Sequence, residues 1–234
     1  MNQLHIVVLD RDTLANRPFD FDFPHTLSSY GTTEAHETLE RIRGADIVIT
    51  NKVVISAQAF AENPQLKLVA VTATGVNNVD VEAAKQNGTA VCNIRAYGNE
   101  SVAEHAFMMM ITLMRNLPAY QRDVAAGLWE NSPFFCHLGA PMRDLNGKTL
   151  AIFGRGNIGK TLATYAQAFK MNVVFAEHKN AQSVRDGYVS FDEAIRSADV
   201  VSLNCPLTPQ TANMIGEAEL QQMKPGAILI NCGR

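Results

Sequence analysis

The 234-residue chain has few of the features that mark secreted, metal-binding or nucleic-acid-binding proteins. Its four cysteines, at positions 92, 136, 205 and 232, are widely scattered and no pair has metal-ligand spacing, so we expect no metal site and reduced thiols in a cytoplasmic protein. The net charge is −3 and 18% of the residues are charged, without a long run of either sign. This composition argues against nucleic acid or an anionic membrane as a partner.

Long apolar runs are also absent. The densest apolar stretch, residues 106–114, is interrupted by Thr112 and is too short to span a bilayer, so no membrane partner is expected. The short apolar run at residues 4–9 ends at Asp10 and lacks a basic leader and a small-residue cleavage site, which favours a first strand over a signal peptide. With 47% hydrophobic residues, the chain can bury one large core or two modest ones.

Strand-like and helix-like segments alternate over the first hundred residues. Runs rich in Val and Ile predict strands at residues 4–9, 46–50, 66–72 and 89–94, and capped amphipathic segments predict helices at residues 32–43 and 56–63. Alternation of this kind indicates a parallel sheet covered by helices. Residues 101–115 are apolar nearly all round, so this helix is predicted to be buried on most faces, between two domains or in a subunit interface.

The second half opens with the glycine-rich segment Gly154-Arg155-Gly156-Asn157-Ile158-Gly159. An apolar run precedes it, and a helix-period stretch, a second apolar run at residues 173–176 and then Glu177 follow it. This order is a dinucleotide-binding fingerprint: the first glycine permits a tight turn, the second lets the backbone approach a pyrophosphate, and the third lets helix pack on strand. Glu177 is predicted to accept hydrogen bonds from ribose hydroxyls.

The pattern continues to the end of the given sequence. It predicts helices at residues 191–197 and 217–223 and strands at residues 199–203 and 227–231, with a turn at residues 205–209. A six-stranded Rossmann sheet would need further strands, so the second domain is expected to be incomplete, with residues 227–231 as an edge strand open to association. We place a substrate domain at residues 1–98 and a dinucleotide-binding domain at residues 99–234.

Four blocks of this sequence together resemble the D-2-hydroxyacid dehydrogenase family over essentially the whole length. They are residues 74–80 (TGVNNVD, followed by Asn87-Gly88), residues 100–105 (ESVAEH), the fingerprint with Glu177, and residues 205–211 (CPLTPQT) with residues 224–234 (KPGAILINCGR). Residues 129–136 (WENSPFFC) look most like the glycerate dehydrogenase and hydroxypyruvate reductase branch. The resemblance implies an α/β protein with a flavodoxin-like substrate domain and a doubly wound Rossmann domain that binds NAD.

The same resemblance implies roles for individual residues. Backbone N–H groups of Gly75 and Val76 would bind the carboxylate of a small 2-oxo acid, and Arg234 would be the catalytic residue, binding carboxylate and carbonyl where negative charge grows. Cys205 and Cys232 would be contact residues and not nucleophiles. The implied cofactor-binding residues are Val102, Gly154, Arg155, Gly156, Asn157, Ile158, Gly159, Glu177, His178, Lys179, Cys205, Pro206, Thr211, Asn231, Cys232 and Gly233.

Two features qualify the activity and the choice of cofactor. The family's catalytic Glu and His would lie beyond Arg234; of the six histidines present, His105 is the nearest candidate, and it is expected to be a satisfied interface residue. The charge of Glu177 favours NAD by repelling a 2′-phosphate, although Lys179 could soften that exclusion, so NADP is the less favoured cofactor.

Three interpretations stay open. The first is an NAD-dependent enzyme that interconverts a hydroxypyruvate-like or glyoxylate-like 2-oxo acid and its D-2-hydroxy acid. The second is a truncated, catalytically weak homologue that binds NAD and forms a homodimer through residues 101–115. The third is another branch of the family that acts on a different small anion.

Overall fold

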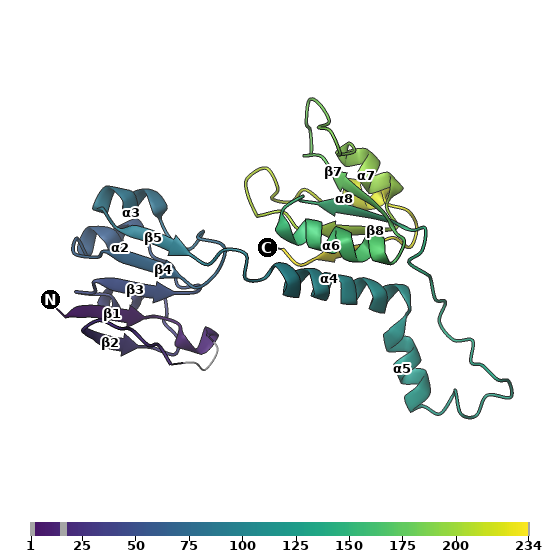
Figure 1. Cartoon of the computed structure of the whole chain (residues 1–234), viewed down its shortest axis with the longest axis horizontal. Helices are drawn as coiled ribbons and strands as arrows, with labels where there is room; N and C mark the ends of the chain where they lie inside the picture. Colours follow the sequence, from purple (N-terminus) through teal and green to yellow (C-terminus); the bar gives the residue numbers. More distant parts are fainter. Residues whose placement is uncertain (1–2, 15–17, 234) are drawn as a thin grey trace. The chain divides into compact units, whose positions relative to one another are not determined.

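The computed structural model describes residues 3–14 and 18–233 (Figure 1). The chain divides into two compact units, Met1–Tyr97 and Gly98–Arg234, and this division lies one residue from the boundary expected from the sequence. In the described ranges, none of the helices combines the length and apolar character needed to cross a bilayer.

The first unit is a parallel sheet of five strands with short helices. The strands are β1 (Leu4–Val8), β2 (His25–Ser29), β3 (Ile47–Thr50), β4 (Leu68–Val71) and β5 (Ala90–Asn93), in the order β2-β1-β3-β4-β5. The helices are α1 (Thr38–Arg41), α2 (Ala57–Glu62) and α3 (Val81–Asn87), with a 3-10 turn η1 (Arg11–Thr13). This strand order is flavodoxin-like, as expected.

Both faces of the central strand β1 are buried, which explains its continuous apolar sequence. Val7 lies in the larger cluster with Ile42 and Phe60, whereas Ile6 and Val8 lie in a cluster on which three phenylalanines pack. Successive side chains of a strand point to opposite faces, so an unbroken Val and Ile run is what a doubly covered parallel strand requires.

One local prediction for this unit differs from the structure, and two of its elements were not predicted. The helix predicted at residues 32–43 is mostly wrong, because only Thr38–Arg41 is α-helical. The hydroxyl of Thr33 donates to the carbonyl of Leu9, and the guanidinium of Arg41 donates to the carbonyl of Thr32, so side chains tie this segment back to β1 instead of letting it start a helix. Strand β2 (HTLSS) was not predicted because it is a largely polar edge strand. Helix α3 was not predicted either.

The second unit is a four-stranded parallel sheet with helices on both faces. Its elements are α4 (Asn99–Met114), α5 (Leu117–Ala125), β6 (Thr149–Phe153), α6 (Asn157–Ala168), β7 (Asn172–Ala176), α7 (Phe191–Ser197), β8 (Val200–Leu203), α8 (Glu217–Gln222) and β9 (Ile228–Asn231). The strand order is β7-β6-β8-β9, so β9 is an edge strand in the described sheet. The strands and helices predicted from residue 149 onward are confirmed to within about two residues.

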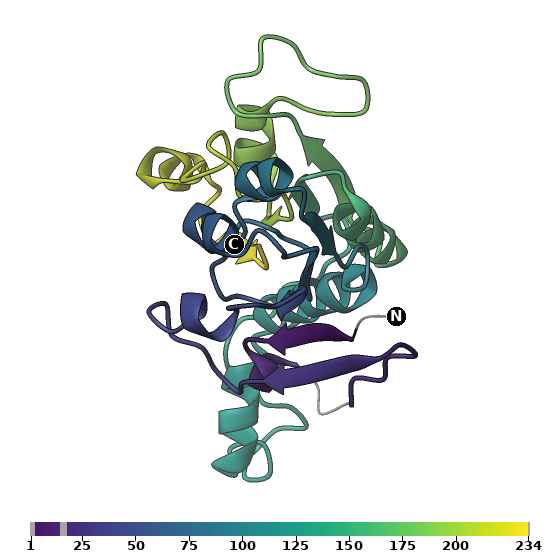
Figure 2. The same ribbon diagram turned by 90° about the vertical axis from the view of Figure 1, so that its left-hand side faces the viewer.

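The two faces of this sheet are covered by different helices. Helices α4 and α6 pack together on one face, where Met110 and Leu162 share a cluster with Ile152 of β6 (Figure 1). Helix α7 covers the other face, where Ile195 packs with Phe153 and Val201. The segment between β7 and α7 forms a long loop that stands out from the sheet at the top of Figure 2.

Within the second unit, helix α4 is buried on one face. Its buried residues are Ala103, Ala106, Met110 and Met114, the spacing of a single helical face. Met108 and Leu113 remain 52% and 46% exposed, and His105 is also exposed. A place for this helix in a subunit interface stays a prediction, because the structure contains a single chain.

Candidate functional site: a glycine turn at the switch point of the second sheet

The glycine turn lies where the strand order of the second sheet reverses. The chain leaves β6 toward β7 on one side and returns to β8 on the other, so the carboxyl ends of β6 and β8 flank a switch point. Ligands of open α/β sheets bind at such points. Gly154 follows β6 directly and has a φ of +111°, a conformation that side chains rarely adopt. A Cβ there would lie 2.8 Å from backbone atoms of Asn204 and Cys205, so only glycine fits.

The other two glycines have different surroundings. A Cβ on Gly159 would collide with the carbonyl oxygen of Gly154 and would lie 3.1 Å from Ile152, so this glycine lets α6 pack closely on β6. A Cβ on Gly156, by contrast, would meet nothing within 4 Å. Gly156 is the N-cap residue of α6 and provides no side-chain cap, so open space lies in front of the N-terminal N–H groups of a twelve-residue helix. This is the arrangement that binds phosphate groups. Of the two residues between these glycines, Asn157 is exposed and the half-buried Ile158 packs against the helical face of the core.

Asn204 provides a further polar group beside this turn. Its Nδ2 donates to the hydroxyl of Ser202 over 3.0 Å, while its buried Oδ1 has no hydrogen-bond partner in the part of the chain that the structure describes. A buried acceptor without a donor costs free energy unless a ligand satisfies it. An unsatisfied acceptor next to a glycine turn and a helix N-terminus fits a ligand that carries hydroxyls as well as phosphates, as a dinucleotide does.

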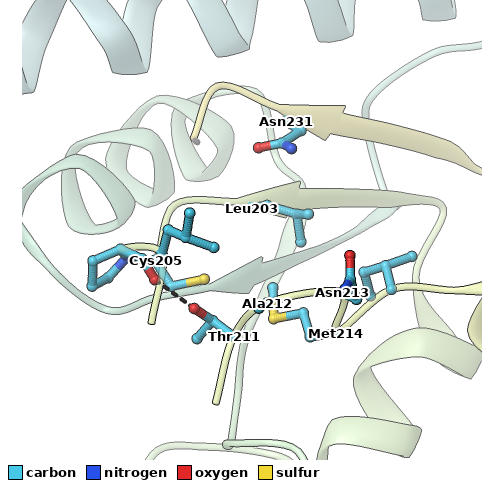
Figure 3. Close-up of a pocket in the computed structure, with 10 residues that line it drawn as sticks. Leu203, Cys205, Thr211, Ala212, Asn213, Met214 and Asn231 are labelled. Carbon is cyan, nitrogen blue, oxygen red and sulfur yellow. Dashed lines mark hydrogen bonds between the residues drawn. The ribbon is translucent and has the colours of Figure 1, made fainter. Parts of the chain in front are cut away.

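A pocket of about 320 Å³ opens beyond the carboxyl ends of β8 and β9 (Figure 3). Cys205, Pro206, Thr211 and Asn231, all predicted cofactor contacts, lie in its wall with Leu203 and Met214. The hydroxyl of Thr211 donates to the carbonyl of Pro206 over 2.7 Å and accepts from the N–H of Thr208 over 2.8 Å, so its direct role is to fix the loop that shapes the pocket.

The two cysteines near the pocket are not activated. Burial raises the pKa of the Cys205 thiol and that of the Cys232 thiol above their ordinary values. A raised pKa leaves less thiolate at neutral pH, and the thiolate is the nucleophilic form. A nucleophilic role is thus disfavoured for both thiols, and their contact with a cofactor stays a prediction.

Glu177 directly follows β7, as predicted, but its carboxylate already has partners. Arg185 donates to it from Nε and Nη2, each over 2.7 Å, and the backbone N–H groups of His178 and Arg185 donate over 2.8 Å and 3.1 Å. Hydrogen bonds from the Arg185 guanidinium lower the pKa of Glu177 to about 2. A contact from this carboxylate to a ribose therefore stays a prediction. Lys179 forms an ion pair with Glu219 over 2.7 Å and is not directed at Glu177.

The predicted substrate loop lies in the first unit, between β4 and α3. Val76 packs against the core, and its carbonyl accepts from the N–H of Val79 over 3.0 Å. Among the described residues, the N–H groups of Gly75 and Val76 have no acceptor. These two adjacent backbone donors follow the carboxyl end of β4.

The remaining predicted residues lie in α4 and in the segment from the end of β9 onward. Val102 is a half-buried residue of α4, and Asn231 at the end of β9 accepts from the N–H of Gly233 over 2.9 Å, which shapes the turn that contains Cys232. The predicted catalytic residue, Arg234, lies outside the described residues. Asn204 and Arg185 were missed. The position of Asn204 directly after a predicted strand could have revealed it, whereas Arg185 lies in a loop whose sequence carries no such signal.

Comparison with known proteins identifies the family. Residues 107–234 match the family described as "D-isomer specific 2-hydroxyacid dehydrogenase, NAD binding domain". The chain is 40% identical to glycerate dehydrogenase of Methylorubrum extorquens, over 98% of this chain and 72% of the relative. It is 36% identical to hydroxypyruvate reductase of Blautia hydrogenotrophica, over 86% of this chain and 64% of the relative.

A solved structure agrees with these relatives. The fold matches that of D-lactate dehydrogenase from Aquifex aeolicus, complexed with NAD and lactic acid, with a TM-score of 0.78 and 28% identity over 98% of this chain and 69% of that one. The glycine turn, the open helix N-terminus and the unsatisfied Asn204 fit the same cofactor. The chain belongs to the D-isomer-specific 2-hydroxyacid dehydrogenase family, and its cofactor is NAD.

Proposed function

We propose that the protein interconverts a small 2-oxo acid of the hydroxypyruvate or glyoxylate type and the corresponding D-2-hydroxy acid. The observation that carries this proposal is that the N–H groups of Gly75 and Val76 have no acceptor among the described residues, which leaves two adjacent donors for the carboxylate of such an acid. The names of the two relatives, a glycerate dehydrogenase and a hydroxypyruvate reductase, favour a three-carbon substrate.

In this proposal the two units have separate tasks. The first unit binds the substrate carboxylate through Gly75 and Val76, and the second holds the cofactor at the glycine turn. The nicotinamide cofactor donates or accepts the hydride. Arg234 places a rigid fork of N–H donors on the carboxylate and carbonyl, which stabilises the negative charge that grows on the oxygen during reduction.

The test is the decay of NADH absorbance with hydroxypyruvate, glyoxylate, formate and phosphite as a substrate panel. We expect turnover with the first two, and we expect Arg234→Ala to lower it by about 10²–10³, the usual effect of losing one oxyanion donor. Arg196→Ala, on α7, is the matched control for loss of an arginine.

Each other outcome contradicts a named part of the proposal. Unchanged turnover in Arg234→Ala would remove Arg234 from the site. Binding of NADH without turnover of any acid would favour the catalytically weak homologue, and turnover of formate or phosphite alone would favour another branch of the family.

We further propose that the protein works as a cytoplasmic homodimer. The segment from Leu117 to Met142, here called the arm, consists of α5 and the loop after it. It exposes several large apolar side chains, with Phe135 98%, Leu138 89% and Phe134 74% exposed. Met108 and Leu113 of α4 are also exposed. Apolar side chains gathered in this way favour contact with another protein surface, and a second copy of the chain is the occupant that we propose.

A further inference from the structure

The acid that should discriminate between NAD and NADP is buried and neutralised by an arginine. The carboxylate of Glu177 is only 3% exposed, whereas the Arg185 side chain that pairs with it is 53% exposed. Two guanidinium nitrogens and two backbone N–H groups donate to the two carboxylate oxygens. Nη1 of Arg185 donates no hydrogen bond to the described residues.

A second arginine lies at the same strand end. Arg155, inside the glycine fingerprint, places its guanidinium 4.8 Å from the ring centroid of Phe175 and 5.3 Å from that of Tyr188. The guanidinium of Arg185 lies 4.2 Å from the same Tyr188 ring. Cation–π contacts of this kind hold both cations beside the strand end. Arg155 forms no ion pair with the described acids.

The three side chains joined by these contacts carry a net positive charge, which the exposed Asp186 next to Arg185 offsets in part. Glu177 contributes one negative charge, and Arg155 and Arg185 contribute two positive charges. In a Rossmann site the acid at this position accepts a hydrogen bond from the ribose 2′-hydroxyl of NAD and repels the 2′-phosphate of NADP. A nearby arginine, by contrast, accommodates that phosphate. Here both kinds of residue are present, and the acid is paired.

We propose that Arg185 sets the dinucleotide selectivity of this protein. By pairing with Glu177 it removes the repulsion of a 2′-phosphate, so that, with Arg155 nearby, the site accepts NADPH as an alternative to NADH. The proposal rests on the cofactor site at the glycine turn. It assigns the relaxed selectivity to Arg185 and not to Lys179, because Lys179 is paired with Glu219 and the carbonyl of Met214.

Direct binding tests this without any need for turnover. The dissociation constants of NADH and NADPH are measured by fluorescence titration at one fixed, low ionic strength for five proteins: wild type, Arg185→Met, Glu177→Gln, the double variant and the control Arg196→Met. In the wild type the two constants should differ by less than about tenfold. Arg185→Met exposes the charge of Glu177, so the ratio of the NADPH constant to the NADH constant should rise by about tenfold or more, equivalent to ~1.4 kcal/mol.

The double variant separates masking of Glu177 from direct phosphate binding. With Glu177→Gln in place there is no carboxylate to unmask, so adding Arg185→Met should move the ratio by less than about threefold, well below the tenfold step of ~1.4 kcal/mol. Arg196→Met on α7 is the control for loss of one positive charge, and its ratio should equal that of the wild type.

Three results would overturn the proposal. One is an unchanged ratio in Arg185→Met when that variant still binds NADH and has the melting temperature of Arg196→Met. Another is an equal shift with and without Glu177, which would make Arg185 a direct phosphate ligand only. The third is a wild type that binds neither dinucleotide, and in that case the proposed function fails as well.

Discussion

Gly154→Ala and Gly156→Ala, two residues apart in one turn, should differ in effect: the first should lower stability, whereas the second should leave stability nearly unchanged and weaken NADH binding. At Gly154 the φ of +111° strains any side chain, and the new Cβ would lie 2.8 Å from backbone atoms of Asn204 and Cys205, which cannot move as a side-chain end can. Strained backbone costs roughly 1–3 kcal/mol and overpacking another 1–3 kcal/mol, so about 3 kcal/mol is a reasonable expectation.

At Gly156 the structure gives the opposite expectation. The backbone is extended, with φ of −79°, and a Cβ would meet nothing within 4 Å. Alanine restricts the unfolded chain more than glycine does but is a poorer N-cap, so these opposed effects should change stability by less than about 1 kcal/mol. The same Cβ would occupy the open space through which a pyrophosphate approaches the backbone, so the affinity for NADH should fall by at least about tenfold.

The assay is thermal unfolding by circular dichroism together with NADH titration by fluorescence. For a unit of this size, a loss of about 3 kcal/mol lowers the melting temperature by roughly 6–12 °C. Gly154→Ala should show this loss, whereas Gly156→Ala should melt within about 3 °C of the wild type and bind NADH poorly. The reasoning would be refuted if Gly154→Ala melted like the wild type, or if Gly156→Ala bound NADH as tightly as the wild type.

Three further predictions concern pH, a buried acid and assembly. The pKa of Glu177 lies near 2 in the folded protein against an ordinary 4.5, so its pairing stabilises the fold above about pH 4.5 and loses that effect as the pH falls toward 2. As the pH falls over this range, the melting temperature of Glu177→Gln should therefore decline less steeply than that of the wild type. Equal slopes would contradict the assignment. Asp10 is buried, and its carboxylate accepts hydrogen bonds from the backbone N–H groups of residues 51 and 52 over 2.9 Å and 2.6 Å. Asp10→Asn should therefore lower the free energy of unfolding, measured in urea, by about 1.5–3 kcal/mol. The control Asp20→Asn, at an exposed site, should leave it unchanged. Phe135→Ser should shift the mass in light scattering from dimer toward monomer, with Val54→Ser in the first unit as control, and a wild type that is monomeric at high concentration would count against the dimer.

Much of the second unit was predictable because its signals are local. A buried parallel strand needs an unbroken apolar run, and α7 (Phe191–Ser197) starts at Ser190, whose hydroxyl accepts from the N–H of Glu193. The glycine spacing likewise reports a turn made within a few residues. Length, charge and cysteine spacing indicated which classes of protein to exclude. The residue patterns predicted the α/β fold and the dinucleotide-binding turn.

The features that were missed depend on residues distant in sequence or on side chains without a periodic pattern. Strand β2 forms because its backbone pairs with β1, which its polar sequence does not reveal. Position 154 requires glycine because the chain returns fifty residues later and places the backbone of Asn204 against it. Arg185 neutralises Glu177 across a loop in which no pattern marks the pair. Local hydrophobic and capping patterns thus determined which elements form, while tertiary folding decided which charges and acceptors are satisfied, because these energies depend on distances that sequence spacing does not fix.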